Sequence, residues 1–349
     1  MPTALVTGAT GLLGSYLVER LRRDGWTVRA LVRDPDAARW LTREHDVALV
    51  AGDVLDAGTI AAAARGCDVL FHAAALITPR AGWEAFRRVN VEGTRAALAA
   101  AHAAGARLLH VSSVAVYGAT ARYGRGAGGT DERVPLAPLP PEEWYARSKR
   151  ESEALVLDAH HRGELWATAI RPVVLYGRRD RQFVPRIARL LRAGLVPLPD
   201  GGRATLAVVH AANVAEAALL AATHDAAGGQ AYNVANDFDV STAGFLRLGA
   251  RGLGRTVRIV AVPRGVARAG VGAASLALRL LGARPLATMV GNTVRFIAEG
   301  NPFTSERARQ ELGWRPHVRP EEGVPDAFRW WREHGEGGSR PERVRPHGA

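Results

Sequence analysis

The chain has 349 residues, 47% hydrophobic and 23% charged, a composition typical of a globular protein with one large core or two smaller ones. Its single cysteine, Cys67, excludes an intrachain disulfide and a multi-cysteine metal site, and we assign no metal ligands. The formal net charge is +12, but the arginines are scattered in ones and twos without a nucleic-acid-binding motif. We therefore expect no nucleic-acid partner.

The N-terminal half alternates short apolar runs with helical patterns. Strands are predicted at residues 3–7, 27–32, 47–53, 68–75, 106–113 and 165–172, and helices at 12–25, 84–105 and 145–161. Strands separated by helices of this length form right-handed βαβ units with a parallel sheet. The sequence therefore predicts a doubly wound α/β domain.

The C-terminal half is less regular, with helical patterns at 181–194 and 213–224 and mixed short elements over 236–334. We expect a first domain formed by 1–173 and 205–235, and a smaller C-terminal substrate-binding lobe formed by 174–204 and 236–334. Residues 335–349 are rich in Gly, Pro and Arg without apolar periodicity, which predicts a disordered tail.

One apolar segment, residues 265–283, has the length of a membrane span. It contains Arg268 and Arg279, which argue against a transmembrane helix and favour a helix packed on the smaller lobe. An amphipathic helix at a membrane surface is the second interpretation, with weak interfacial contact. No signal peptide precedes the first strand, and the cysteine content fits a reducing compartment, so we expect a cytoplasmic protein.

A glycine-rich loop, TGATGLLG (7–14), joins the first strand to the first helix. Glycine there permits positive φ, close approach of the backbone to a pyrophosphate and tight packing of the helix on the strand, and the helix N-terminus attracts phosphate. The strand–loop–helix context predicts a dinucleotide site. The residues expected to contact the cofactor in this loop are Gly8, Thr10, Gly11, Leu12, Leu13 and Gly14.

The end of the second strand bears on the choice between NAD(H) and NADP(H). An acidic residue there would bind the ribose hydroxyls of NAD, whereas here Val32 is followed by Arg33, which suits a 2′-phosphate. The sequence therefore favours NADP(H), and Asp34 leaves NAD(H) open. After the next two strands, Asp53 and Val54 would lie near the adenine, and the small residues Ala73, Ala74 and Ala75 beside the cofactor.

Tyr145 and Lys149 are four residues apart and share one face of a predicted helix, and Ser113 ends a predicted central strand. A tyrosine hydroxyl can exchange a proton with a carbonyl or alcohol oxygen if a nearby ammonium lowers its pKa. A serine hydroxyl can polarise the carbonyl. Lys149 is the only lysine among 46 basic residues, and guanidinium is a poor substitute for the compact ammonium.

The chain resembles the extended short-chain dehydrogenase/reductase family, the NAD-dependent epimerase/dehydratase-like group. The matching motifs run in order over roughly residues 3–330: TGATGLLG, GDV with Asp53, FHAAA, VNVEGT with Asn90, VSSVAVYG with Ser113, YARSK with Tyr145 and Lys149, IRPVVLYG with Arg171 and Pro172, and ERARQELGWRP. The resemblance implies a Rossmann-type domain, a smaller substrate lobe and Ser/Tyr/Lys catalysis, with Tyr145, Lys149 and Pro172 also touching the cofactor. Asn90 is a weaker candidate, for support through a water or for a helix contact.

Within this family, Val114 and Ala115 replace the acidic pair usual in sugar dehydratases, and Leu206 stands where epimerases often have a diphosphate-binding arginine, although Arg203 could partly compensate. The HAANVAEA element resembles the 3β-hydroxysteroid dehydrogenase and dihydroflavonol-reductase-like branches. These imply an NADP(H)-dependent oxidoreductase for a small, fairly apolar steroid- or flavonol-like substrate, and dimers are common in the family. The alternatives are an NAD-dependent nucleotide-sugar epimerase and a non-catalytic dinucleotide sensor.

Overall fold

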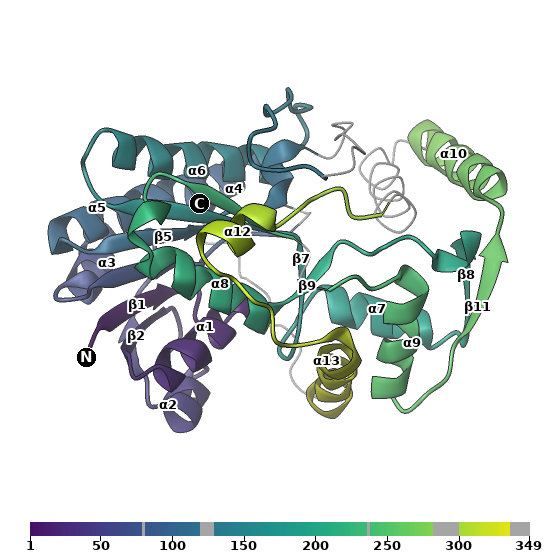
Figure 1. Ribbon diagram of the computed structural model, residues 1–349, viewed down its shortest axis with the longest axis horizontal. Helices are drawn as coiled ribbons and strands as arrows, with labels where there is room; N and C mark the ends of the chain where they lie inside the picture. The colour runs from purple at the N-terminus through teal and green to yellow at the C-terminus, as the bar shows by residue number, and fades with distance from the viewer. Residues whose placement is uncertain (79–80, 119–128, 236–237, 282–299, 336–349) are drawn as a thin grey trace.

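The larger of two lobes is built around a parallel β-sheet, which lies to the left in Figure 1, with the smaller lobe to the right. The structure is a computed structural model that describes residues 1–78, 81–118, 129–235, 238–281 and 300–335. The predicted tail, apart from Gly335, lies outside the described residues.

Within the described residues the main sheet has seven strands, all parallel to their neighbours. In order across the sheet they are β10 (Ala231–Val234), β6 (Ala167–Pro172), β5 (Arg107–Val111), β4 (Val69–His72), β1 (Thr3–Thr7), β2 (Thr27–Val32) and β3 (Ala48–Ala51). The order of the strands reverses between β1 and β4. Ligands of such sheets bind at this reversal, beyond the carboxyl ends of the strands.

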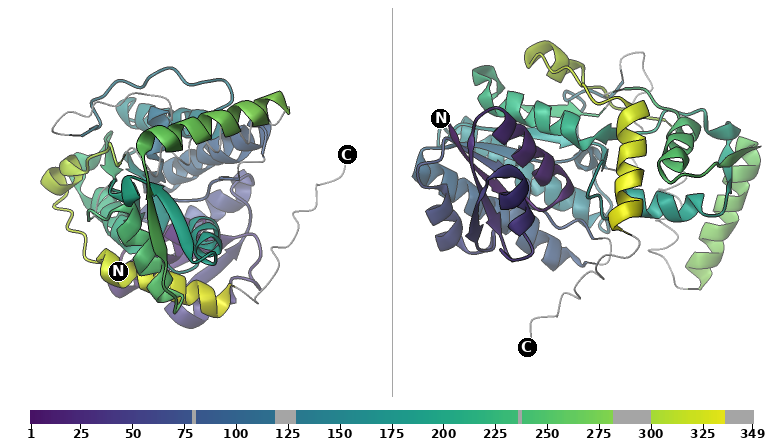
Figure 2. Two further views of the ribbon diagram at one scale, coloured as in Figure 1. Left: turned by 90° about the vertical axis from the view of Figure 1, so that its right-hand side faces the viewer. Right: turned by 90° about the horizontal axis from the view of Figure 1, so that it is seen from below.

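Helices cover both faces of the sheet (Figures 1 and 2). One face packs against α1 (Leu12–Arg23) and α8 (Ala211–Thr223), with α2 (Arg39–His45) beside α1. The other face packs against α3 (Ala57–Ala64), α5 (Gly93–Ala104) and α6 (Trp144–His161). The predicted doubly wound Rossmann-type fold is confirmed. The strands predicted at 47–53, 68–75 and 106–113 are shorter than expected.

The helix predicted over 84–105 is confirmed, because residues 83–104 are helical without a break. It consists of α4 (Trp83–Phe86), a π-helical stretch η1 (Arg87–Glu92) and α5. Gly105 ends α5 with a φ of +63°, as its position predicts. A π-helical turn inserts an extra residue per turn, and such turns occur often at functional sites. Here it contains Asn90.

The smaller lobe has its own apolar core, formed by side chains from β8 (Leu195–Pro199), α7 (Phe183–Leu191), α9 (Thr242–Gly252) and α13 (Pro320–His334). β8 pairs in parallel with β11 (Arg258–Val262), which leads into α10 (Arg264–Leu280). β7 (Val174–Tyr176) pairs with β9 (Val208–His210) between the lobes in Figure 1. The short elements η2 (Val114–Tyr117), η3 (Asp200–Gly202), η4 (Asp225–Ala227) and α12 (Glu306–Glu311) complete the described chain.

The segment predicted as a helix at 265–283 forms α10, whose following residues 282–299 are not described. Among the described residues no helix is long and apolar enough to cross a membrane.

The packing of α13 on α9 leads to a prediction about Gly252. A Cβ added there would lie 2.4 Å from the Pro325 carbonyl oxygen and 2.9 Å from Phe328 Cβ, because the two helices are in close contact. We expect Gly252→Ala to destabilise the protein by about 1–3 kcal/mol through overpacking, seen as a lower urea midpoint.

Gly272 is the matched control, because a Cβ added to this residue of α10 meets nothing within 4 Å. Gly272→Ala should stabilise by about 0.5–1 kcal/mol through helix propensity. Equal midpoints for the two variants would contradict the packing argument.

Candidate active site

The glycine loop between β1 and α1 is shaped by close backbone approach. Gly8 has a φ of +70°, and a Cβ there would lie 2.7 Å from the Ala74 nitrogen and 2.9 Å from the Ala73 carbonyl. A Cβ on Gly14 would lie 2.1 Å from the Gly8 oxygen. A side chain at either position would collide with backbone atoms, so only glycine fits. The loop backbone can therefore lie directly against the segment that follows β4.

The first turn of α1 keeps its amide groups available. Gly11 is its N-cap, and no side chain caps this end of the helix. Four N–H groups at a helix start lack helical partners and attract a pyrophosphate. Thr10 and Leu12 are partly exposed at this turn, whereas the Leu13 side chain is buried in the core, so Leu13 can contribute only its backbone. These residues fit a dinucleotide.

Arg33 directly follows the buried end of β2 and is exposed. The Asp34 carboxylate instead accepts a hydrogen bond from the Ala37 amide at 3.0 Å, in a local turn. Asp53 accepts from the Leu55 amide at 3.0 Å, and Val54 packs against the α3–α5 face. Arg33 thus has an unobstructed position next to the glycine loop, while Asp34 is committed to its own turn.

Asn90 ties two elements of the site together. Its amide group exchanges hydrogen bonds with the Leu76 backbone, at 2.7 Å to the amide and 3.1 Å to the carbonyl, just beyond Ala73–Ala75. It also donates to Ser148 Oγ on α6 at 2.9 Å. The Asn90 side chain therefore makes a helix contact and holds the segment after β4 against α6.

Ser113 and Tyr145 meet at the carboxyl end of β5. Ser113 Oγ donates to the Pro172 carbonyl at 3.5 Å and accepts from the Ala115 amide at 3.2 Å. Burial raises the pKa of Tyr145, and its hydrogen bond with Ser113 opposes that rise. This differs from the lowered pKa expected from the sequence. A protonated tyrosine in contact with a serine hydroxyl is suited to donate a proton.

Lys149 lies beneath this pair on the same helix as Tyr145. Its side chain is 3% exposed, and Nζ donates to the Val111 carbonyl at 2.7 Å, two residues before Ser113. Burial lowers the pKa of Lys149 to about 8, although Glu153 partly counters the effect. The ammonium therefore lies at the carboxyl end of β5, two residues before Ser113.

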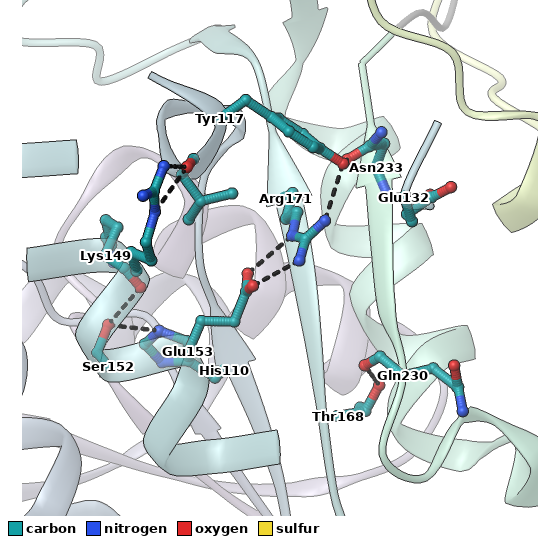
Figure 3. Close-up of polar contacts among 12 residues, drawn as sticks. His110, Tyr117, Glu132, Lys149, Ser152, Glu153, Thr168, Arg171, Gln230 and Asn233 are labelled. Carbon is teal, nitrogen blue, oxygen red and sulfur yellow. Dashed lines mark hydrogen bonds and ion pairs between the residues drawn. The ribbon is translucent and has the colours of Figure 1, made fainter. Parts of the chain in front are cut away.

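Glu153, one turn after Lys149, belongs to a buried ion pair (Figure 3). Arg171 donates from Nε and Nη2 to the two carboxylate oxygens at 2.9 and 2.6 Å. Arg171 Nη1 also donates to Tyr117 Oη at 2.8 Å, and that hydroxyl donates to Asn233 at 3.0 Å. A bidentate pair with further hydrogen bonds offsets much of the cost of burying two charges. The network joins α6 to β6 and β10.

Two buried histidines stack beside Lys149, His72 on β4 and His110 on β5, with ring centroids 5.7 Å apart. Burial, followed by repulsion from the ammonium, lowers the pKa of His72 to about 3 and that of His110 well below its usual value. His110 Nε2 hydrogen bonds with Ser152 Oγ at 3.1 Å (Figure 3). Both rings are therefore neutral at physiological pH, which leaves Glu153 as the counter-charge for Lys149.

Ser113, Tyr145, Lys149 and the glycine loop, predicted to lie at one edge of the sheet, follow or face the carboxyl ends of its strands in the structure. The positions of Glu153, His72 and His110 around Lys149 were not predicted. The sequence feature that could have indicated a role for Glu153 is its position four residues after Lys149, which places the two side chains on the same helix face.

The chain is similar over most of its length to characterised proteins. Residues 4–235 match the model of the NAD-dependent epimerase/dehydratase family. A ketoreductase from Stigmatella aurantiaca, named for a farnesyl-bearing dihydroquinoline oxide, is 34% identical to this chain. The match covers 97% of this chain and 99% of the relative. A 2-alkyl-3-oxoalkanoate reductase from Shewanella oneidensis is 28% identical over 92% and 84%. The solved UDP-glucuronic acid 4-epimerase from Bacillus cereus has a TM-score of 0.71 at 17% identity, covering 95% and 99% of the two chains.

Because Lys149 is the only lysine, its pKa can be read from a single NMR signal after ¹³C labelling of lysine. We expect an apparent pKa near 8 in the folded protein, since burial disfavours the ammonium. Glu153→Gln should move that pKa further down, because it removes the negative charge that favours the ammonium.

Arg171→Gln is the matched control, because it breaks the same ion pair but leaves the Glu153 carboxylate in place. In that variant the pKa of Lys149 should not fall. A fall as large as that of Glu153→Gln would assign the shift to repacking rather than to charge.

Proposed function

The chain belongs to the NAD-dependent epimerase/dehydratase family of extended short-chain dehydrogenases/reductases, and we propose that it is an NADP(H)-dependent ketone reductase for a fairly apolar substrate. Relatives that align over most of this chain are named as reductases and dehydrogenases, so it is an NAD(P)-dependent oxidoreductase. The single observation that best supports the proposed chemistry is that Ser113, Tyr145 and Lys149 meet at the carboxyl end of β5, where Ser113 hydrogen bonds with Tyr145 and Lys149 with the Val111 carbonyl.

In the proposed reaction a bound nicotinamide supplies the hydride. Ser113 donates a hydrogen bond to the substrate carbonyl oxygen and so stabilises the negative charge that develops there. Tyr145 gives its hydroxyl proton to the same oxygen, which yields the alcohol. The raised pKa of Tyr145 means that its hydroxyl is protonated at neutral pH, as a proton donor must be. Lys149 supplies the positive charge that stabilises the resulting phenolate.

The preference for NADP(H) rests on Arg33. It is exposed at the end of β2, where a 2′-phosphate would lie, and Asp34 is held in a turn by the Ala37 amide. A guanidinium can form two parallel hydrogen bonds with a phosphate.

The substrate class is inferred from relatives and from the small lobe. The ketoreductase from Stigmatella aurantiaca is named for a farnesylated substrate, and the reductase from Shewanella oneidensis for an alkyl oxoalkanoate. Both names describe ketones that carry hydrocarbon groups. We propose that residues 174–204 and 236–334 bind such a ketone, opposite the dinucleotide domain formed by 1–173 and 205–235.

A nucleotide-sugar epimerase is disfavoured by one residue. Leu206, at the position where epimerases often have a diphosphate-binding arginine, is buried in the core of the small lobe and offers no charge to a diphosphate. Arg203 nearby is exposed and is the residue that could partly compensate. At 17% identity the similarity to the sugar epimerase is one of fold.

Removal of the proton donor tests the mechanism. We expect Tyr145→Phe to lower turnover of a ketone found by screening by about 100-fold or more, with NADPH affinity nearly unchanged, because general acids contribute at least that factor. Lys149→Arg, which keeps the charge, should also lose most activity. Tyr232→Phe on β10, where the hydroxyl bonds Glu311, is the control. Full turnover by Tyr145→Phe would refute the assignment.

Arg33→Ser tests the cofactor preference. A hydrogen bond to a charged group contributes about 1.5–3 kcal/mol, so NADPH affinity should fall roughly 10- to 100-fold while NADH affinity stays the same. Fluorescence titration of each cofactor measures both. Arg39→Ser removes an exposed arginine that pairs with Asp36, and should change neither affinity. Tighter binding of NADH than NADPH by the unmodified protein would contradict the role of Arg33.

A further inference from the structure

Helix α10 exposes large apolar side chains that the proposed chemistry does not use. Val266 is 62% exposed, Leu276 60% and Leu280 80%, and Leu281 just beyond the helix is 81% exposed. Large side chains with this exposure are unusual on a soluble surface when they occur together, and they mark an interaction site.

These residues form one continuous stripe. Positions three or four apart lie on the same side of a helix. Along α10 that spacing selects residues that are all exposed and all apolar, namely Val266, Ala269, Ala273, Leu276, Ala277 and Leu280. The stripe therefore runs the length of the helix, and the described part of the chain leaves it uncovered.

All the charged residues of helix α10 are basic. Its sequence contains three arginines, at 264, 268 and 279, and no aspartate or glutamate. Arg264 pairs with Asp200 at the start of the helix, which fixes α10 to the small lobe. In Figures 1 and 2 the helix lies at the outer edge of that lobe, far from the N-terminal strands.

We propose that α10 docks the protein on the surface of an anionic phospholipid bilayer, with its apolar stripe inserted among the headgroups. A helix of low overall hydrophobicity with an apolar face and arginines but no acidic residues has the character of an interfacial helix. Anionic headgroups attract the arginines. A second copy of this chain fits less well, because α10 contains no aspartate or glutamate and so offers no counter-charge to Arg268 and Arg279 of a partner helix.

This inference goes beyond the proposed function, and it gives that function a location. An apolar ketone partitions into lipid, so a reductase docked by its small lobe meets its substrate at the bilayer. The docking itself requires neither cofactor nor turnover, so it can be tested separately.

The test is flotation of the full chain with vesicles of phosphatidylcholine alone and of phosphatidylcholine mixed with phosphatidylglycerol. We expect the protein to float with the mixed vesicles and to lose most of that binding at high salt or with Leu276→Glu/Leu280→Glu. The control is Leu190→Glu/Leu195→Glu, which adds the same charge at exposed leucines of the small lobe outside α10 and should still bind. Thermal unfolding and NADPH titration check that both variants remain folded.

Absence of the unmodified protein from floated mixed vesicles would overturn the proposal, as would equal binding by the α10 variant. Self-association without vesicles that Leu276→Glu/Leu280→Glu abolishes would assign the stripe to a second copy and also overturn it. If vesicles bind normally but no ketone is reduced, the proposed function fails while the docking surface stands.

Discussion

The ammonium of Lys149 is the constraint on which the candidate site depends. A charge with 3% exposure must be compensated, and the fold supplies the compensation from three directions. The Val111 carbonyl accepts a hydrogen bond from Nζ, Glu153 supplies the opposite charge, and the neighbouring histidines are neutral and add no repulsion. Glu153 is in turn held by Arg171, so the charge state of one side chain is linked to the alignment of α6, β6 and β10. The same charge is what a tyrosine proton donor requires nearby.

The parts of the molecule that local sequence determines were predictable. The strand–glycine–helix unit at the N-terminus is specified within about twenty residues, and the spacing of Tyr145 and Lys149 fixes their common face whatever surrounds them. The alternation of strands and helices likewise limits the sheet to a few topologies. Any Cβ at Gly8 or Gly14 would collide with backbone atoms. The glycines in the sequence therefore indicated the close backbone contact that the fold contains.

What could not be predicted depends on residues far apart in the sequence. Glu153 and Arg171 lie on different elements, and nothing local indicates that each is the other's partner. The helix after β4 contains a π-helical stretch in which Asn90 contacts the Leu76 backbone and Ser148, and apolar periodicity does not reveal these contacts. The core of the small lobe is formed by elements that are far apart in the sequence, such as α7, α9 and α13, so local patterns do not show which of their apolar residues pack together.

Residues near the C-terminal end of the chain contribute to both apolar cores, and this affects how the protein folds during its synthesis. Ala308, Leu312 and Trp314 belong to the core between the sheet and α1, while Val324, Phe328 and Trp331 of α13 fill the core of the small lobe. Neither core is complete until residues beyond 300 have left the ribosome. The nascent chain therefore exposes unfinished apolar surface in both lobes until late in translation, and the small lobe is completed last, when α13 has been synthesised.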